Sequence, residues 1–179
     1  MSSKVEMIFW DVQHGHATYI KTPNGRHIVV DLGVGTYSGV TPFSPLKHLR
    51  DKYHVEQLDY VIITHPHKDH IDDIMEFDAM NPKVLTRPYE LTNEEVMKDV
   101  RKDDRTIFEK YCEINDRYSA TVDEVSYNNT RNSANWGGLS IRIFYSSKCS
   151  HDNFNNHSII TVFEYANTKV VIPGDNENA

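Results

Sequence analysis

Four side chains that can bind a metal ion lie within the six residues HPHKDH at positions 65–70. They follow directly after an apolar, β-branched run, LDYVIIT, which is typical of a buried strand. His65 and His67 alternate along the chain, so both can point toward one cation, and Asp69 with His70 can face a neighbouring position. Imidazole and carboxylate ligands together suit Zn²⁺ best and also bind Mn²⁺ or Fe²⁺. The segment therefore predicts a site for one or two metal ions at a strand end.

Such a site predicts hydrolysis. Two metal ions about 3.5–4 Å apart can share a water, lower its pKa and hold a phosphate or carbonyl oxygen. The competing interpretation is a polar loop whose histidines only form hydrogen bonds. Four ligand-type residues in six positions after an apolar strand favour the metal site. No Ser/His/Asp or Cys/His arrangement and no glycine-rich phosphate loop stands out in the sequence.

Strands, a tight turn and a helix are expected before this segment. Asn24-Gly25 between two β-prone runs predicts a hairpin. Ser44 followed by Pro45 predicts an N-cap and a first helical turn. The expected strands are 5–12, 17–22, 26–31 and 58–64, and the expected helix is 45–52.

After the segment, the pattern is helical first and then β-rich. Thr92 and Glu95 fit a capping box that opens a charged helical region, with a break near Asp103-Asp104. The Asn-, Ser- and Gly-rich stretch 126–138 is the least structured by composition. We expect helices at 71–77 and 92–118, strands at 83–85, 139–145, 158–165 and 169–173, and a tight turn at 166–168.

Composition indicates one folded domain over residues 1–179, with 39% apolar and 25% charged residues. The net charge of −7 argues against a protein that coats nucleic acid, although metal ions and a local basic rim can still hold phosphates. The cations Lys98, Arg101, Lys102 and Arg105 are interleaved with acids, which favours a solvated face.

The sequence also predicts a cytoplasmic protein. No basic segment followed by an apolar run opens the chain, and no stretch approaches the roughly 18 apolar residues of a membrane helix. Cys112 and Cys149 form no CxxC unit and are expected to be ordinary thiols of a reducing compartment.

HPHKDH matches the HxHxDH signature of the metallo-β-lactamase superfamily, whose members are αββα sandwiches of the α+β class with one or two metals. Three further segments resemble the branch that contains the soluble domain of the competence protein ComEC. They are DVQHGHA at 11–17, IVVDLG at 28–33, and NNHS at 155–158 with VVIPGD at 170–175. The resemblance runs from about residue 5 to the end, and residues 86–138 match only in general character.

The resemblance implies a role for each matching residue. His65 and His67 would hold the first metal, and Asp69 and His70 the second. Asp175 would bridge both metals. His157 stands near the position of a third ligand for the first metal, with a hydrogen-bonding role as the alternative. Asp69 would also orient the attacking water or accept its proton.

Three departures from the family pattern stand out. The leading motif carries His14 and His16 where the branch has other residues, and an altered loop is the favoured interpretation of this change. The alternative is that residues here line the cleft, and the candidates are Asp11, His14, His16 and Asp31. Asp72-Asp73 replace small glycines, which favours a helix N-terminus electrostatically. The family's final histidine, beyond the GD motif, has no counterpart before Ala179, so we expect a C-terminally truncated domain that lacks its last strand and helix, with further domains or partner chains in a longer protein.

The resemblance to ComEC-like domains implies a phosphodiester substrate, and therefore a nuclease or nucleotide phosphodiesterase. The same activated water would serve a thioester, lactone or lactam hydrolase. A third alternative is a sensor or interaction module with an incomplete site.

Overall fold

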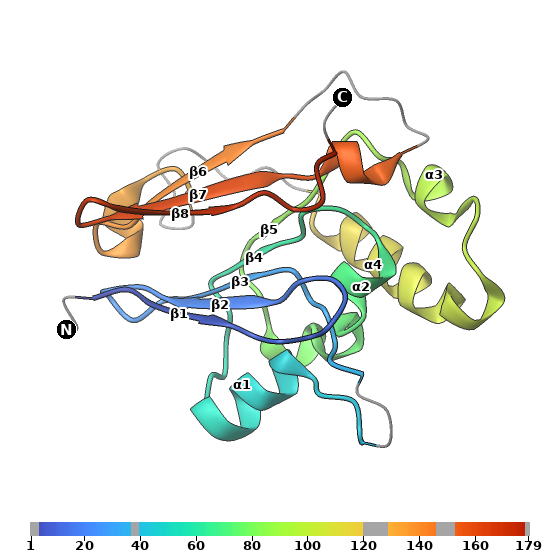
Figure 1. Ribbon diagram of the computed structural model, residues 1–179, viewed down its shortest axis with the longest axis horizontal. Coiled ribbons are helices and arrows are strands. Elements are labelled where there is room, and N and C mark those ends of the chain that lie inside the picture. Colours follow the sequence, from blue (N-terminus) through green and yellow to red (C-terminus); the bar gives the residue numbers. More distant parts are fainter. Residues whose placement is uncertain (1–3, 37–39, 120–128, 146–152, 178–179) are drawn as a thin grey trace.

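Two stacked β-sheets with helices against one of them form the part of the chain that the computed structural model describes, residues 4–36, 40–119, 129–145 and 153–177 (Figure 1). The N-terminal sheet has the strand order β1-β2-β3-β4-β5, and the C-terminal sheet has the order β6-β7-β8. The strands are β1 Glu6–Phe9, β2 Thr18–Lys21, β3 His27–Val30, β4 Tyr60–Ile62, β5 Leu85–Thr86, β6 Ser140–Phe144, β7 Ile160–Tyr165 and β8 Thr168–Ile172.

The N-terminal sheet confirms the predicted hairpin and the buried strand. β1, β2 and β3 are antiparallel, and the turn between β2 and β3 is closed by a 2.9 Å bond from the Gly25 N–H to the Thr22 carbonyl. β3, β4 and β5 are parallel. All three residues of β4 are buried, as expected for a strand covered on both faces. The expected strand at 83–85 is shifted to Leu85–Thr86.

Helices pack on the outer face of the N-terminal sheet. Ser44 caps α1 by accepting from the Lys47 N–H, and Thr92 and Glu95 form both bonds of the predicted capping box. The expected break near Asp103-Asp104 is a 3₁₀ turn, η3. The helices are α1 Pro45–Tyr53, α2 Lys68–Ile71, α3 Asn93–Met97 and α4 Arg105–Arg117, with 3₁₀ turns η1 Ile74–Glu76, η2 Asp78–Met80, η3 Lys102–Asp104, η4 Ser133–Trp136 and η5 Phe154–His157.

The helix expected at 71–77 is wrong in its bounds. α2 already begins at Lys68, inside the HPHKDH segment, and ends at Ile71. The cause is tertiary: the Leu32 N–H donates to the His70 carbonyl at 2.8 Å, and the Asp73 N–H donates to the Leu32 carbonyl at 2.7 Å. These two backbone groups are the ones that a continuing α-helix would use, so the chain goes on in 3₁₀ turns.

The C-terminal sheet is a meander of three antiparallel strands. Ala166 and Asn167 both have positive φ, at 48° and 65°, which is the backbone of a two-residue hairpin loop and confirms the predicted tight turn. Part of the stretch expected to be least structured is well packed. Trp136 in η4 is fully buried and stacks on Tyr60 at 5.8 Å, while residues 126–128 of that stretch lie outside the described residues.

Two hydrophobic cores hold these layers together. One contains Val29, Val61 and Phe77 and lies between the N-terminal sheet and the helices. The other contains Ile28, Ile62 and Phe163 and lies between the two sheets. The described residues thus supply three layers of the αββα fold. On the outer face of the second sheet, Phe144 and Val171 are 49% and 55% exposed.

Two expectations about the protein's surroundings can be compared with the described residues. No helix among them combines the length and the apolar character needed to cross a membrane. Cys112 is a partly buried free thiol, and burial raises its pKa to about 11. Cys149 lies outside the described residues.

Candidate metal centre

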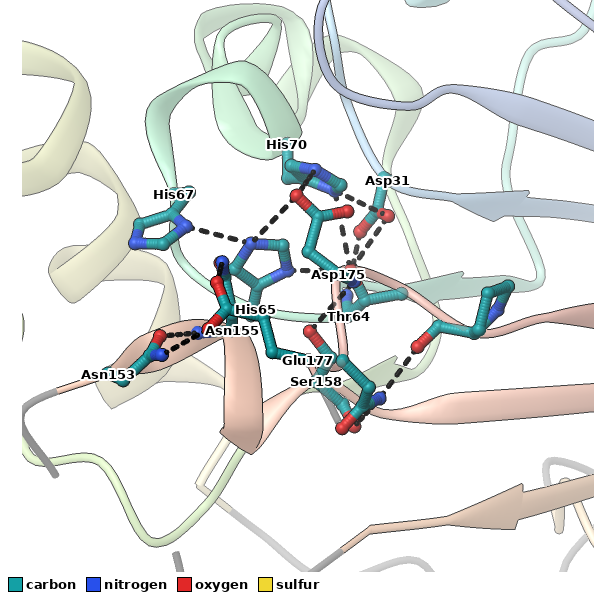
Figure 2. Close-up of polar contacts among 12 residues, drawn as sticks. Asp31, Thr64, His65, His67, His70, Asn153, Asn155, Ser158, Asp175 and Glu177 are labelled. Atoms are coloured by element: carbon teal, nitrogen blue, oxygen red, sulfur yellow. Dashed lines mark hydrogen bonds and ion pairs between the residues drawn. The ribbon is translucent and has the colours of Figure 1, made fainter. Parts of the chain in front are cut away.

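The candidate metal centre lies where strand ends of both sheets meet (Figure 2). Thr64 and His65, in the loop after β4, and His70, in α2, are fully or almost fully buried. The Ile159 N–H donates to the Thr64 carbonyl at 2.9 Å and joins the entry of β7 to the end of β4. This bond fixes the two sheets against each other beside the cluster.

His65 and His67 face each other through ring nitrogens. The His65 Nε2 lies 3.0 Å from the His67 Nδ1. The Thr64 hydroxyl donates to Asp31, so it accepts from the Nδ1–H of His65 at 3.1 Å. That bond places the lone pair of His65 on Nε2, toward His67.

Asp31 fixes His70 in the same way. The His70 Nδ1 donates to Asp31 Oδ2 at 2.9 Å, while the carboxylate also accepts the Thr64 N–H at 2.7 Å. The lone pair of His70 is therefore on Nε2. That atom is buried and has no hydrogen-bond partner among the described residues. A histidine whose one nitrogen is held by a carboxylate and whose other nitrogen is left bare is a typical metal ligand.

Asp175 reaches the histidines from the C-terminal sheet. It follows β8, and its Oδ2 lies 3.4 Å from His70 Nε2 and 3.9 Å from His65 Nε2. Its N–H donates to the Ser158 hydroxyl at 3.1 Å. Gly174 has φ of +61°, and a Cβ there would lie 2.7 Å from the Ser158 Cβ and 3.0 Å from the Thr64 Cβ. Glycine therefore lets the end of β8 approach the cluster.

The geometry fits a cation. Ligand atoms of His65, His70 and Asp175 all lie within 4.8 Å of one another. A tetrahedral ion with bonds of about 2.0–2.1 Å has ligand atoms about 3.3 Å apart, which is close to the observed separations. Two imidazole lone pairs at 3.0 Å repel each other unless a proton or a cation lies between them. The donor set of nitrogen and carboxylate oxygen suits a divalent transition metal.

Burial keeps the facing histidines neutral and ready to bind a metal. Desolvation lowers the pKa of His65 to about 2 and also lowers the pKa of His67. Burial acts on His70 in the same direction, but the hydrogen bond and charge of Asp31 outweigh it and raise its pKa. The Asp175 side chain is 46% exposed, so the cluster is open to solvent on that side.

Asp69, the predicted catalytic residue, lies beside this group rather than in it. It sits in the first turn of α2, and its carboxylate is not among the ligand atoms that lie within 4.8 Å of one another. Its charge opposes the effect of burial on the pKa of His67 and helps to raise the pKa of His70. Its carboxylate is therefore within electrostatic reach of both histidines.

The other predicted residues are spread around the cluster. His157 is buried in η5 and does not join the ligand group. Asp11 and His14 are exposed. His16 is partly buried with its Nε2 2.8 Å from the Thr18 hydroxyl, and burial lowers its pKa while the charges of Asp31 and Asp175 act in the opposite direction. Among the four candidate cleft residues, Asp31 is the one in direct contact with a clustered histidine.

Three residues near the cluster have roles that sequence reasoning missed. The Asn153 and Asn155 side-chain amides donate to the two carboxylate oxygens of Glu177, at 3.0 and 2.7 Å. This clamp ties η5 to the segment that carries Asp175 (Figure 2). The asparagine-rich run before β7 was a visible signal for a turn, but nothing in the sequence marked Glu177 as its partner.

The comparison with protein families agrees with this geometry. The sequence model of the metallo-beta-lactamase superfamily matches residues 10–123, which is more than half of the chain. The protein belongs to the metallo-beta-lactamase superfamily.

Its curated relatives are named UPF0173 metal-dependent hydrolase. The one from Sulfurisphaera tokodaii is 36% identical over 80 residues, 44% of this chain and 32% of the relative. The one from Roseiflexus castenholzii is 30% identical over 97 residues, 54% of this chain and 38% of the relative. The aligned regions thus span about a third of the length of these relatives.

Among solved structures, the protein is similar to an archaeal metallo-beta-lactamase superfamily protein from Sulfolobus tokodaii. The two share 17% sequence identity with a TM-score of 0.46, over 92% of this chain and 61% of that chain.

Proposed function

We propose that this protein is a metal-dependent hydrolase and that phosphodiesters are its substrates. The observation that carries the proposal is the convergence of His65, His70 and Asp175 around the bare, buried Nε2 of His70. The names of the curated relatives point to the same class of activity.

In this proposal, some residues of the centre bind the metal ion and another transfers a proton. His65, His67, His70 and Asp175 would hold the metal, and Asp31 keeps the ring of His70 in its ligand orientation. A bound divalent cation supplies Lewis acidity, which lowers the pKa of water and stabilises negative charge on a phosphoryl oxygen. Asp69 would orient the attacking water and accept its proton, since its carboxylate lies beside the histidines at the start of α2.

The phosphodiester assignment is supported by the three segments that resemble ComEC-like domains, at 11–17, at 28–33, and at 155–158 with 170–175. It is an argument from analogy within one fold. The half-exposed Asp175 carboxylate gives a substrate access to the cluster.

Metal content and hydrolysis, measured on the same samples, test the proposal. The purified chain is compared with His65→Ala/His67→Ala and with His48→Ala, which removes a histidine from α1 as a control. We expect one or two equivalents of Zn²⁺, Mn²⁺ or Fe²⁺ in the parent and the control, lost in the double variant. Hydrolysis of bis(p-nitrophenyl) phosphate should follow metal content.

Other outcomes would overturn part or all of this function. A folded parent chain that binds no added metal contradicts the whole proposal. Hydrolysis of a thioester, a lactone or a lactam without hydrolysis of the diester reassigns the substrate. Bound metal without hydrolysis of any of these compounds would instead indicate a sensor or interaction module.

A further inference from the structure

A cavity of about 680 Å³ opens directly beside the candidate metal centre. His67 lines it together with Phe154 of η5, and α3 with the segment after it supplies another part of the lining. Its volume is within the range of small-molecule sites, which is about 300–1,000 Å³. That part of the lining comes from residues 86–138, the region that resembles the family only in general character.

The cavity has a mixed lining, and four apolar side chains form one part of it. Val96 and Phe108 are buried, and Val100 and Phe154 are partly buried against the same hydrophobic core. The Phe154 ring lies 5.8 Å from the His67 ring with an angle of 36° between the planes. The apolar part of the lining thus includes a ring that lies next to a candidate metal ligand.

Some charged side chains at the rim of the cavity form hydrogen bonds or ion pairs within the protein, and others do not. Glu95 accepts hydrogen bonds from the Thr92 backbone and hydroxyl, and Lys68 binds Asp72 at 2.6 Å. Within the described residues, the side chains of Lys98, Arg101 and Asp99 make no hydrogen bond or ion pair. Two cations and one anion are therefore left to meet a ligand.

This arrangement refines the interpretation of the basic cluster. Arg105 pairs with Glu109 on α4, as a solvated face predicts. Lys98 and Arg101, by contrast, line the cavity beside the metal centre.

We propose that this cavity is the substrate pocket and that it takes the planar, apolar group of a small phosphodiester, with an anionic substituent at the rim near Lys98 and Arg101. The inference rests on the proposed function. A planar group can stack on Phe154 while its phosphate reaches His67, because the two rings are adjacent. The volume of the pocket and the net charge of −7 favour a small diester over a long polyanion.

Two substrates with the same leaving group test the pocket. Bis(p-nitrophenyl) phosphate has an aryl group to fill the cavity, whereas methyl p-nitrophenyl phosphate has only a methyl group. We expect the metal-loaded parent to prefer the aryl diester in kcat/KM by about tenfold, as for one stacked ring. Phe154→Ala should abolish that preference through KM. Phe154→Leu, which keeps apolar volume, should retain part of it.

The matched control is Phe144→Ala, which removes an exposed phenylalanine from β6 in the other sheet and should leave the preference unchanged. Binding of diphenyl phosphate by calorimetry gives a readout without turnover. If the parent hydrolyses neither diester but still binds diphenyl phosphate, and Phe154→Ala loses that binding, the pocket stands and the proposed function fails. An unchanged preference in Phe154→Ala, or unchanged binding, overturns the pocket.

The rim has its own measurement. A double variant, Lys98→Ala/Arg101→Ala, should raise KM for thymidine 5′-(p-nitrophenyl phosphate) 3′-phosphate, which carries a second anion, by about tenfold. The KM for bis(p-nitrophenyl) phosphate should hardly change. Arg105→Ala is the control. Equal effects on both compounds would exclude a specific role for the two cations.

Discussion

His70 Nδ1 and Asp31 Oδ2 are 2.9 Å apart in the interior of the protein, where neither side chain is more than 1% exposed. Asp31 adopts φ of +58°, an uncommon backbone conformation for a residue other than glycine. The carboxylate accepts three hydrogen bonds, from the Thr64 N–H, the Thr64 hydroxyl and His70. The end of β3 thereby fixes both the loop after β4 and the ring that it carries.

Replacing Asp31 by Asn should weaken metal binding. The amide removes the negative charge that favours Nδ1–H on His70, so its Nε2 becomes a poorer ligand. Metal affinity, measured by competition with a coloured chelator, should fall by about 10–100-fold. Asp51→Asn, on the exposed side of α1, is the control. Equal affinities in the two variants would show that Asp31 does not support the ligand.

Gly15 packs against the HPHKDH segment, and its replacement by Ala should disturb that segment. An added Cβ would lie 2.0 Å from the Asp69 carbonyl oxygen. Gly25 has a similar φ, +84° against +78°, with nothing within 4 Å of an added Cβ. Gly25→Ala therefore measures the backbone strain alone. We expect Gly15→Ala to lower the free energy of unfolding, measured in urea, by about 1–3 kcal/mol more than Gly25→Ala does. It should also bind metal more weakly. Equal losses would mean that the contact is easily relieved.

Glu177 should contribute to metal binding without touching the metal. Glu177 lies two residues after Asp175, and its two carboxylate oxygens accept hydrogen bonds from the side-chain amides of Asn153 and Asn155. Glu177→Ala frees the segment, so the affinity for metal should fall by about tenfold. Glu164→Ala removes an exposed carboxylate from β7 and should have no effect. Calorimetric titration with Zn²⁺ distinguishes the two variants, and an unchanged affinity in Glu177→Ala contradicts the role.

Asp73 should make the stability of the protein depend on pH. Burial raises its pKa from 3.8 to about 7, while its Oδ2 accepts the Leu46 N–H at 2.8 Å. Between pH 4 and 7 the unfolded chain releases this proton and the folded chain keeps it, so stability falls as the pH rises. Asp73→Asn removes this contribution.

The measurement for Asp73 is urea unfolding of both proteins in chelator at several pH values. Relative to the variant, the free energy of unfolding of the parent should fall by up to about 1.4 kcal/mol for each pH unit between pH 4 and 7. Above pH 7 it should fall no further. Parallel pH profiles would show that Asp73 ionises normally in the folded state.

Local patterns predicted most of the fold. The hairpin at Gly25, the capping box at Thr92 and the apolar run before His65 each lie within a few residues of sequence, and the structure confirms them. The end of α2 at Ile71 could not be predicted in this way. It depends on two hydrogen bonds to Leu32, which is far away in the chain.

The candidate site shows the same division. The spacing of His65, His67 and His70 predicted a metal-binding segment, and the structure brings these rings together. The clamp at Glu177 and the ring of Phe154 beside His67 had no such signal. The clamp joins residues 22 and 24 positions apart, and the contact of Phe154 with His67 joins segments of the two halves of the fold, so the partners in both are set by tertiary packing.

The three histidines follow β4 of the N-terminal sheet, whereas Asp175 follows β8 of the C-terminal sheet. A cation bound by both would be a cross-link between two halves that otherwise meet through apolar packing and a few hydrogen bonds. Metal binding should therefore raise the thermal stability of the protein. The midpoint of thermal unfolding should rise with metal concentration in the parent and stay constant in Asp175→Ala. The candidate metal centre would then also hold the two sheets together.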